Sequence, residues 1–448
     1  MKRGPQQRRA RRSMLALGLM LAGPSVSAQS LNLEQALRAG AQRPSAQVAA
    51  LEAAADEASA QALQREVWWP SLQLQADQSW HSDQAMVDTP AGALTTSDSR
   101  QLLASLSLRQ PLLDLASSRY RKPAAQAGAR SARALAAREA ERTAFLAARI
   151  WLQAARLEVR IAAARSHERS LEAQSRRLSA LFDSGRALRA DVLSVQLARD
   201  AVRRDLVRLQ QSRAAAGIAL AQAVGRAPPV SPAGYQRLGD DLQLPPADPD
   251  TVAERREDLR ALRQRIAGLG LEAEAVRAEQ RLPTVDLVAE HRQSDGLSLY
   301  PEHDELIALQ LKWTLFDAGT TRLRHREQLL RRDALRARLQ DLQNGIAAEL
   351  ARARADFEAA QAAARYADLA VASARETLDT RNALFDAGRA NVDEVLGAEA
   401  LLADNDALRT TARLDAVEAC LAWQLAAGLP LSPSAAVASD STQQGGQP

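Results

Sequence analysis

An internal repeat constrains the fold of this 448-residue chain more than any other feature of its sequence. Residues 180–193 (ALFDSGRALRADVL) match residues 383–396 (ALFDAGRANVDEVL) at nine of fourteen positions, with an offset of 203. The same offset pairs Leu106 with Leu309 and Asp114 with Asp317. Chance similarity between Ala-rich helices does not hold one register over such a length, so we infer two copies of one structural unit.

Composition divides the chain around these two copies. We place the first repeat at residues 29–226 and the second at residues 251–430. Residues 227–250 are rich in Pro and Gly and are predicted to be a linker. Residues 431–448 are small and polar, so we expect a disordered tail.

Residues 1–28 are predicted to be a cleaved signal peptide. They combine a basic start, an apolar run over residues 14–22 and the small residues Val26, Ser27 and Ala28. The run is short for a permanent span, which disfavours the alternative of an N-terminal membrane anchor. The mature start, Gln29, is not a cysteine, so we expect no lipid anchor.

The six basic residues of this leader account for the apparent basicity of the chain. Without them the formal net charge changes from +4 to −2. The remaining Arg residues alternate with Glu and Asp along helices, as on solvated faces. We therefore expect no binding to nucleic acid.

Long helices dominate the prediction. Aromatic residues make up only 3% of the chain, and Ala, Leu, Arg, Glu and Gln fill the helical stretches, a composition typical of coiled coils and unlike that of an all-β or α/β enzyme. We predict a helix over residues 31–67. Very long helices follow at about 117–183 and 319–386, ~100 Å each, with returning helices at about 190–224 and 392–428.

Four segments alternate apolar and polar residues and are predicted to be strands. They lie at about residues 71–85, 100–114, 284–295 and 304–316, two in each repeat, and residues 87–99 are expected to be a loop. Their length suits a tilted strand that crosses a bilayer. Four strands cannot close a barrel, and open edges are not viable in lipid. Either three copies share a twelve-stranded barrel, or these are soluble hairpins with covered edges.

Aromatic residues stand near the ends of the predicted strands. Trp69 and Trp80 bracket the first strand, Trp313 and Phe316 mark the end of the fourth, and Tyr300 lies in its outer loop. Eleven tilted residues span ~25 Å, the separation of the two aromatic girdles of a membrane barrel. The alternative is that these rings pack where helices meet strands.

The tandem units, the strand hairpins and the segments FDSGRALRADVL and FDAGRANVDEVL together resemble the TolC family of outer-membrane efflux proteins. The resemblance covers nearly all of the mature chain and implies a mainly α fold with a four-strand β contribution. It also implies a homotrimer with a twelve-stranded barrel in the outer membrane and an α-helical tunnel in the periplasm. Such channels dock a periplasmic adaptor (membrane fusion) protein and are driven by an inner-membrane pump. Type I protein secretion uses the same duct and stays open as an alternative.

The resemblance also assigns roles to residues where each long helix turns back. The turns and adaptor-facing tips would be Gly185, Arg186, Ala187, Gly388, Arg389 and Ala390. The periplasmic aperture would carry Asp191, Asp393 and Glu394, which could hold a constriction and favour cations. The chain departs from some members at Ser194 and Gly397, where they place an acid. Asp191 could instead be a helix-dipole acid.

The sequence carries no motif of an enzyme, and we expect no catalysis and no cofactor. The five histidines, His81, His167, His291, His303 and His325, are scattered, so no metal site is expected. Cys420 is the only cysteine, and it has no assigned role. A periplasmic coiled-coil adaptor or structural protein is the distant alternative, but such proteins lack two equivalent halves. The cargo is not readable, because substrate choice resides in the pump.

Overall fold

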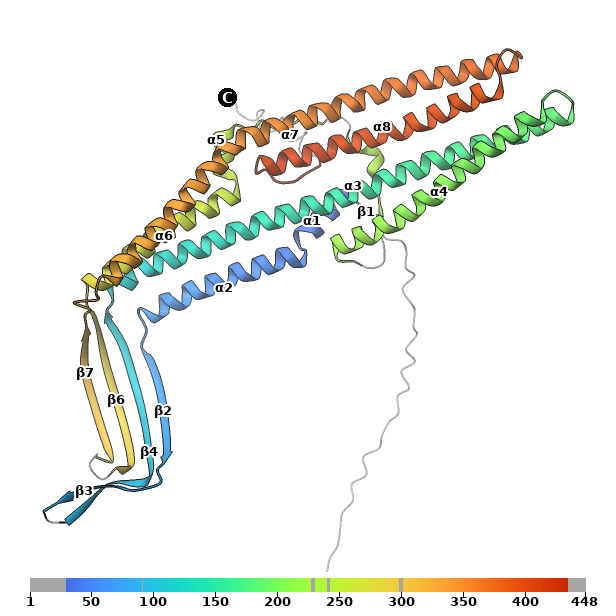
Figure 1. Ribbon diagram of the computed structural model, residues 1–448. Coiled ribbons are helices and arrows are strands. Elements are labelled where there is room, and N and C mark those ends of the chain that lie inside the picture. Colours follow the sequence, from blue (N-terminus) through green and yellow to red (C-terminus); the bar gives the residue numbers. More distant parts are fainter. Residues whose placement is uncertain (1–29, 91, 227–229, 240–241, 298–300, 434–448) are drawn as a thin grey trace, which may run out of the picture.

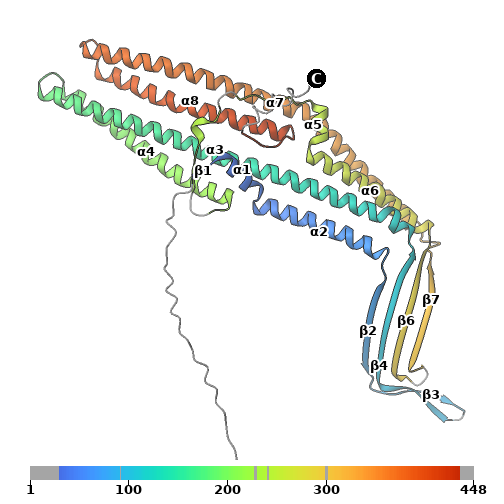
Figure 2. The same ribbon diagram turned by 180° about the vertical axis from the view of Figure 1, so that it is seen from behind.

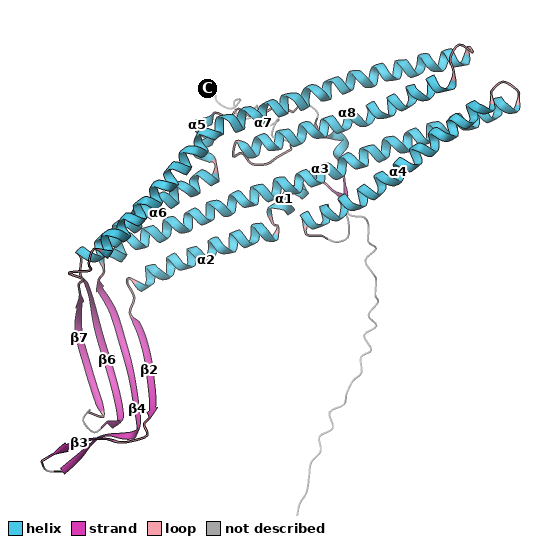
Figure 3. Ribbon diagram, in the orientation of Figure 1, coloured by secondary structure: helices cyan, strands magenta, loops and turns pink. Residues whose placement is uncertain are grey.

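The computed structural model describes residues 30–433, apart from residues 91, 227–229, 240–241 and 298–300. A β-sheet forms one end of the molecule, and long helices run from it to the other end (Figure 1). Figure 3 shows how sharply the strands are separated from the helices. The predicted signal peptide and most of the predicted tail lie outside the described residues.

The two repeats have the same order of elements, and the fold is mainly helical, as predicted. The first repeat contains α1 (Leu33–Ala41), α2 (Pro44–Glu66), β2 (Ser71–Trp80), β3 (Ala85–Thr89), β4 (Gly92–Leu113), a π-helical turn (Ser117–Arg121), α3 (Lys122–Asp183) and α4 (Arg189–Val224). The second contains α5 (Pro249–Arg255), α6 (Glu257–Arg281), β6 (Thr284–Leu297), β7 (His303–Lys312), α7 (Thr320–Asp386) and α8 (Val392–Ala426). The connecting region carries β5 (Ser231–Pro232) and a 3-10 turn (Tyr235–Arg237).

One long helix organises each repeat. Helices α3 and α7, of 62 and 67 residues, span ~90–100 Å. Helices α2 and α4 pack along α3, and α6 and α8 pack along α7. The two hairpins, α3–α4 and α7–α8, turn at the same end of the molecule, opposite the sheet (Figures 1 and 2).

The main core lies midway along the helices, around the fully buried Trp151 of α3. Its indole Nε1 donates a 2.6 Å hydrogen bond to the carbonyl of Leu31. Leu31 belongs to β1 (Ser30–Leu31), which pairs in parallel with β5. The start of the described chain, the connecting region and both repeats are thus joined at one place.

The predicted helix over residues 31–67 is wrong in one respect, because two helices occupy this region. Helix α1 ends at Ala41, and α2 begins at Pro44. A proline has no N–H to continue a helix, and it forces the preceding residue out of the helical region. Arg43 accordingly has an extended backbone, with φ −61° and ψ 153°.

The strand boundaries also differ from those predicted. The first strand ends at Trp80 rather than near residue 85, and the predicted loop over residues 87–99 is largely strand. The chain turns tightly at Gly92, whose φ is +122°, and β4 then pairs with β3 before it reaches β2. The prediction of a loop was wrong because turn-forming residues in this segment can also lie within paired strands, as they do here in β3 and β4. The fourth strand ends at Lys312, so Trp313 and Phe316 follow it.

Two smaller points concern the end of the chain. Leu431 packs on the core, and Ser432 exchanges two 2.9 Å hydrogen bonds with Gln424, so the predicted disorder does not begin at residue 431. Residues 434–448 lie outside the described residues. Cys420 is buried in the core, and burial raises the pKa of its thiol, which makes it a packing residue.

Replacing Gly40 with Ala should destabilise the contact between α1 and α3. An added Cβ would lie 2.5 Å from Ala147 Cβ and 2.8 Å from the Thr143 carbonyl oxygen, and such overpacking costs ~1–3 kcal/mol. Gly345→Ala is the control, since nothing lies within 4 Å of the added atom and Ala is the better helix former. We expect a lower melting temperature for G40A and not for G345A, measured by thermal unfolding followed by circular dichroism. Equal melting temperatures would contradict this packing.

Candidate functional site

The sheet has an apolar patch on one face, next to the helices, and a mainly polar opposite face. Its four long strands are antiparallel in the order β2-β4-β6-β7, so the register decides which side chains share a face. The apolar patch contains Leu72, Leu74, Ala76, Leu102, Leu106, Leu108, Leu287, Ala289, Ile307, Leu309 and Leu311. Toward the outer ends of the strands, the same face carries the polar residues Gln78, Arg100, His291, Gln293, Asp295, His303 and Glu305. The opposite face carries Gln73, Gln75, Asp77, Ser105, Ser107, Arg109, Asp286, Glu290, Arg292, Asp304, Gln310 and Lys312, together with the apolar residues Leu103, Val288, Leu306 and Ala308.

The apolar face has no cover within one copy of the chain. Leu74 is 76% exposed and Ile307 is 80% exposed, values that are unusual for side chains of this size. A contiguous apolar surface of this extent marks a site that contacts lipid or another protein.

Both edges of the sheet are open. Among the described residues β2 pairs only with β4, and β7 pairs only with β6. The outer N–H and C=O groups of both strands are therefore available to pair with another chain.

The polar face carries an ion pair that joins the two repeats. Arg109 of β4 donates from Nε to Oδ2 of Asp286 on β6 at 3.1 Å, and the Asp286 carboxylate is buried. These strands come from different repeats, so the pair lies at the repeat boundary within the sheet. The sequence analysis did not find this pair, because nothing in a single sequence aligns β4 with β6.

The predicted interface aromatics lie at both ends of the strands. Trp69, Trp313 and Phe316 stand at the helical end of the sheet, and Trp80 ends β2 at the other end; each is more than half exposed. Trp313 donates from Nε1 to the carbonyl of Gln280 at 3.1 Å, which fixes its ring beside α6. Trp68, which was not predicted, is also exposed. Tyr300 lies outside the described residues.

An aspartate links the last strand of each repeat to its long helix. Asp114 accepts the backbone N–H of Ser117 at 2.8 Å, and Asp317 accepts those of Gly319 and Thr321 at 3.0 and 2.7 Å. Hydrogen bonds from Thr321, Thr320 and Gly319 lower the pKa of Asp317 to about 2. The repeat therefore preserves a helix-capping carboxylate where sheet and helices meet.

The predicted tips form two matching turns. Gly185 and Gly388 have φ values of +73° and +71°, in the left-handed region that favours glycine. The following arginines donate their backbone N–H groups to Leu181 and Leu384, as in a Schellman motif. The Arg186 and Arg389 side chains are exposed, whereas Ala187 packs on a small apolar cluster and Ala390 is partly buried.

The predicted aperture acids occupy the first turns of α4 and α8. Asp191 accepts the backbone N–H of Leu188 at 3.0 Å, which is the capping role that the sequence left open. Glu394 forms an ion pair with Arg381 of α7. Asp393 is exposed in the same turn.

The two hairpins touch each other behind their tips. An apolar cluster joins them through Leu178, Val195 and Val392. Arg177 of α3 pairs with Asp386 at the end of α7 and lies over the ring of Phe385. Closer to the body, Ser170 and Gln174 of α3 bond to Glu399 of α8. The sequence analysis missed these links, because they depend on how two distant hairpins pack.

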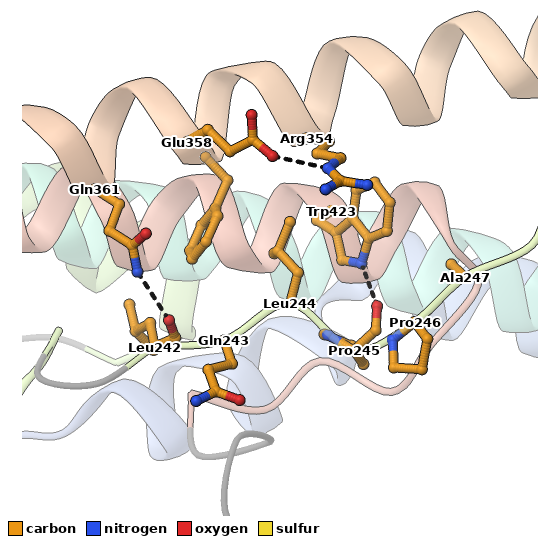
Figure 4. A pocket seen from close by; sticks show the side chains of 11 residues that line it. Leu242, Gln243, Leu244, Pro245, Pro246, Ala247, Arg354, Glu358, Gln361 and Trp423 are labelled. Atoms are coloured by element: carbon orange, nitrogen blue, oxygen red, sulfur yellow. Dashed lines mark hydrogen bonds and ion pairs between the residues drawn. The ribbon is translucent and has the colours of Figure 1, made fainter.

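A surface cavity lies where the connecting region crosses α7 and α8 (Figure 4). Gln361 donates to the carbonyl of Leu242 at 3.1 Å, and Trp423 donates to that of Pro245 at 3.2 Å. The only charged side chains that line it, Arg354 and Glu358, pair with each other. This cavity is a packing feature that fixes the connecting region, and it holds no catalytic arrangement.

The part of the chain that the structure describes contains no group of three or more His, Cys, Asp or Glu side chains placed to hold a metal ion. His291 and His303 stack with ring centroids 6.3 Å apart, because β6 and β7 bring them together. Within residues 30–433, gaps aside, no helix combines the length and apolarity needed to cross a membrane.

Comparison with known proteins agrees with this geometry. Residues 249–429 match the sequence model of the family described as outer membrane efflux protein. No curated protein matches the chain.

Solved structures show a likeness that extends over the whole fold. The chain is similar to CusC (TM-score 0.72, 14% identity, 89% of this chain and 92% of that chain covered), whose crystal structures concern folding and transmembrane channel formation. It is similar to the MtrE outer membrane channel of Neisseria gonorrhoeae (TM-score 0.72, 17% identity, 90% of this chain and 90% of that chain covered). It is also similar to the outer membrane protein VceC of Vibrio cholerae (TM-score 0.68, 18% identity, 89% of this chain and 97% of that chain covered). The predicted resemblance is confirmed, and the descriptions of CusC and MtrE both name a channel.

Replacing Asp317 with Asn should weaken the junction between β7 and α7 in a pH-dependent way. A carboxylate whose pKa is lowered stabilises the fold above its unfolded pKa, and this contribution is lost as the pH falls through about 2. We expect the melting temperature of the wild type to fall between about pH 4 and pH 2 by more than that of D317N. Thermal melts across this range measure the difference, and parallel curves would contradict the cap.

Proposed function

We propose that three copies of this chain form a channel through the outer membrane. In this assembly the open edges of β2 and β7 pair between copies, and twelve strands close one barrel. The apolar face contacts lipid, and the polar face lines an aqueous lumen. The exposed apolar patch on the half of the sheet next to the helices, opposite a mainly polar face, carries this proposal.

The helices continue the channel into the periplasm. Three copies of α3 and α7, with the helices that cover them, form a tunnel of ~100 Å that starts at the barrel. The tips that carry Arg186, Ala187, Arg389 and Ala390 dock a periplasmic adaptor. Asp191, Asp393 and Glu394 lie around the aperture and favour cations there.

The channel acts as the passive exit duct of a tripartite efflux system, fed by an inner-membrane pump. The exposed Trp69, Trp80, Trp313 and Phe316 stand at the two membrane interfaces. Residues 1–28 direct export and are removed. The relatives described as outer membrane channels and as an efflux family support this reading, and type I protein secretion would use the same duct.

A periplasmic adaptor or structural coiled-coil protein would share the helical hairpins. It would have no use for a sheet face with exposed Leu and Ile side chains, or for two equivalent halves. The observations therefore favour the channel.

Fractionation of cells that express the full chain tests this function. We expect the mature protein in the outer membrane, as a trimer on unheated gels and after crosslinking, with cation-preferring conductance in liposomes. A soluble periplasmic monomer without conductance would overturn the proposal.

Two neighbouring residues of β7 distinguish the faces. Leu309 lies on the apolar face and Gln310 on the polar face. We expect Leu309→Arg to reduce the amount of trimer in the outer membrane, because an arginine on the lipid face costs ~2–4 kcal/mol near the bilayer centre. Gln310→Arg is the matched control and should assemble like the wild type. Quantitative gels of membrane fractions measure both, and equal tolerance would argue against a lipid-facing sheet.

A further inference from the structure

A buried carboxyl group joins the two helical hairpins behind their tips. Glu399 of α8 is only 9% exposed. Its Oε1 accepts hydrogen bonds from Ser170 Oγ at 2.9 Å and from Gln174 Nε2 at 3.2 Å, both on α3. Ser170 lies 13 residues before the end of α3, so this contact is ~20 Å from the tip.

Two oxygen atoms at this contact are buried without a hydrogen-bond partner among the described residues. They are Oε2 of Glu399 and Oε1 of Gln174. Both are acceptors when Glu399 is ionised, and buried acceptors without donors destabilise a fold. Because these atoms are enclosed within a single copy, a neighbouring copy cannot supply the missing donor.

One proton would satisfy both atoms. A protonated Oε2 becomes a donor, and the side chain of Gln174 already bonds to Glu399 through its Nε2. The acid and the amide could then form two parallel hydrogen bonds, one in each direction. The arrangement of donors and acceptors thus favours the neutral carboxylic acid.

The electrostatic surroundings agree with this geometry. Burial raises the pKa of Glu399, and the hydrogen bond from Ser170 opposes this only in part. Around Ser170 and Gln174, α3 carries the charged residues His167, Glu168, Arg169, Glu172, Arg176 and Arg177, and around Glu399, α8 carries Asp393, Glu394 and Asp404.

Arg169, Glu172, Arg176 and Asp393 are exposed. Burial lowers the pKa of His167, and Asp404 opposes this in part. Arg177 pairs with Asp386, Glu394 pairs with Arg381, and Glu168 pairs with Arg203 of α4. Glu376 and Asp379 are exposed on α7. Arg199 is half-buried, and its Nε has no partner in the part of the chain described. Glu399 has no ion-pair partner among the described residues.

The contact lies between an apolar cluster and a cavity. On the tip side, the apolar cluster of Leu178, Val195 and Val392 holds the hairpins together. On the body side, a cavity between α3, α4 and α8 is lined by apolar and charged side chains, His167 and Asp404 among them.

Nearer the body, Arg156 of α3 pairs with Glu418 of α8, so the hairpins are joined there as well. A change at Glu399 therefore acts on the part of the α3–α8 contact that is closest to the tips after the apolar cluster.

We propose that Glu399 is a proton-dependent latch between the two hairpins. The neutral acid holds α8 on α3 through Ser170 and Gln174. Loss of the proton leaves a buried charge facing a buried amide oxygen, so α8 loosens from α3. In the channel described under Proposed function, on which only this last step rests, the tips would separate more readily at higher pH.

Hydrogen exchange of the full protein tests the latch without requiring conductance. We expect protection over residues 392–405, corrected for intrinsic exchange, to fall roughly tenfold per pH unit as Glu399 ionises. Glu399→Gln mimics the neutral acid and should keep its protection across pH 5 to 8. Glu172→Gln, an exposed acid on α3, is the matched control and should behave as the wild type. An identical fall in E399Q, or no fall in the wild type, would overturn the proposal.

Infrared spectroscopy gives a second readout that does not depend on opening. The wild type should retain the carbonyl band of a neutral carboxylic acid above the pH at which exposed carboxyls ionise, and E399Q should lack it. Absence of this band in the wild type would overturn the proposal, even if E399Q failed to fold. If both measurements agree with the latch but the protein conducts no ions, the proposed channel function is wrong and the proposal for Glu399 still holds.

Discussion

Unpaired backbone groups at the two edges of the sheet determine how the rest of this molecule can work. Each edge strand, β2 and β7, presents N–H and C=O groups with no partner among the described residues. A sheet that exposes Leu74 and Ile307 on one face suits lipid, but a lipid environment cannot satisfy open edges. Closure with other copies resolves both problems at once. The helices that continue from the strands are then arranged around the same axis.

The repeat explains how one chain supplies four long strands and two similar helical hairpins, because each copy contributes two strands and one hairpin. Asp114 and Asp317 cap the start of the helical run that follows each hairpin, and Gly185 and Gly388 reverse the chain at the far end. The two repeats meet once in the sheet, at the β4–β6 boundary, where Arg109 pairs with Asp286. The two copies thus share a complete unit, and the first adds the β3–β4 pairing, which the described part of the second lacks.

Much of this could be predicted from the sequence, because the decisive signals are local and occur twice. Glycines at the tips, alternation in the strands and long proline-free helices each follow from short-range chemistry. The break before Pro44 and the tight turn at Gly92 were missed, because a proline or glycine does not reveal from sequence alone whether it ends an element or bends it. The contact of Glu399 with Ser170 and Gln174 joins positions more than 220 residues apart and has no counterpart in a local pattern.

Disulfide scanning between β2 and β7 tests the shared barrel most directly. Each variant would carry one cysteine in β2 and one in β7, in a chain with Cys420 replaced by Ala. The outer-membrane fraction of cells that express it would then be oxidised. The account predicts covalent trimers for pairs at matching heights along the two strands and none for mismatched pairs. If no pair links two copies, the edges do not meet, and the barrel is not formed as described.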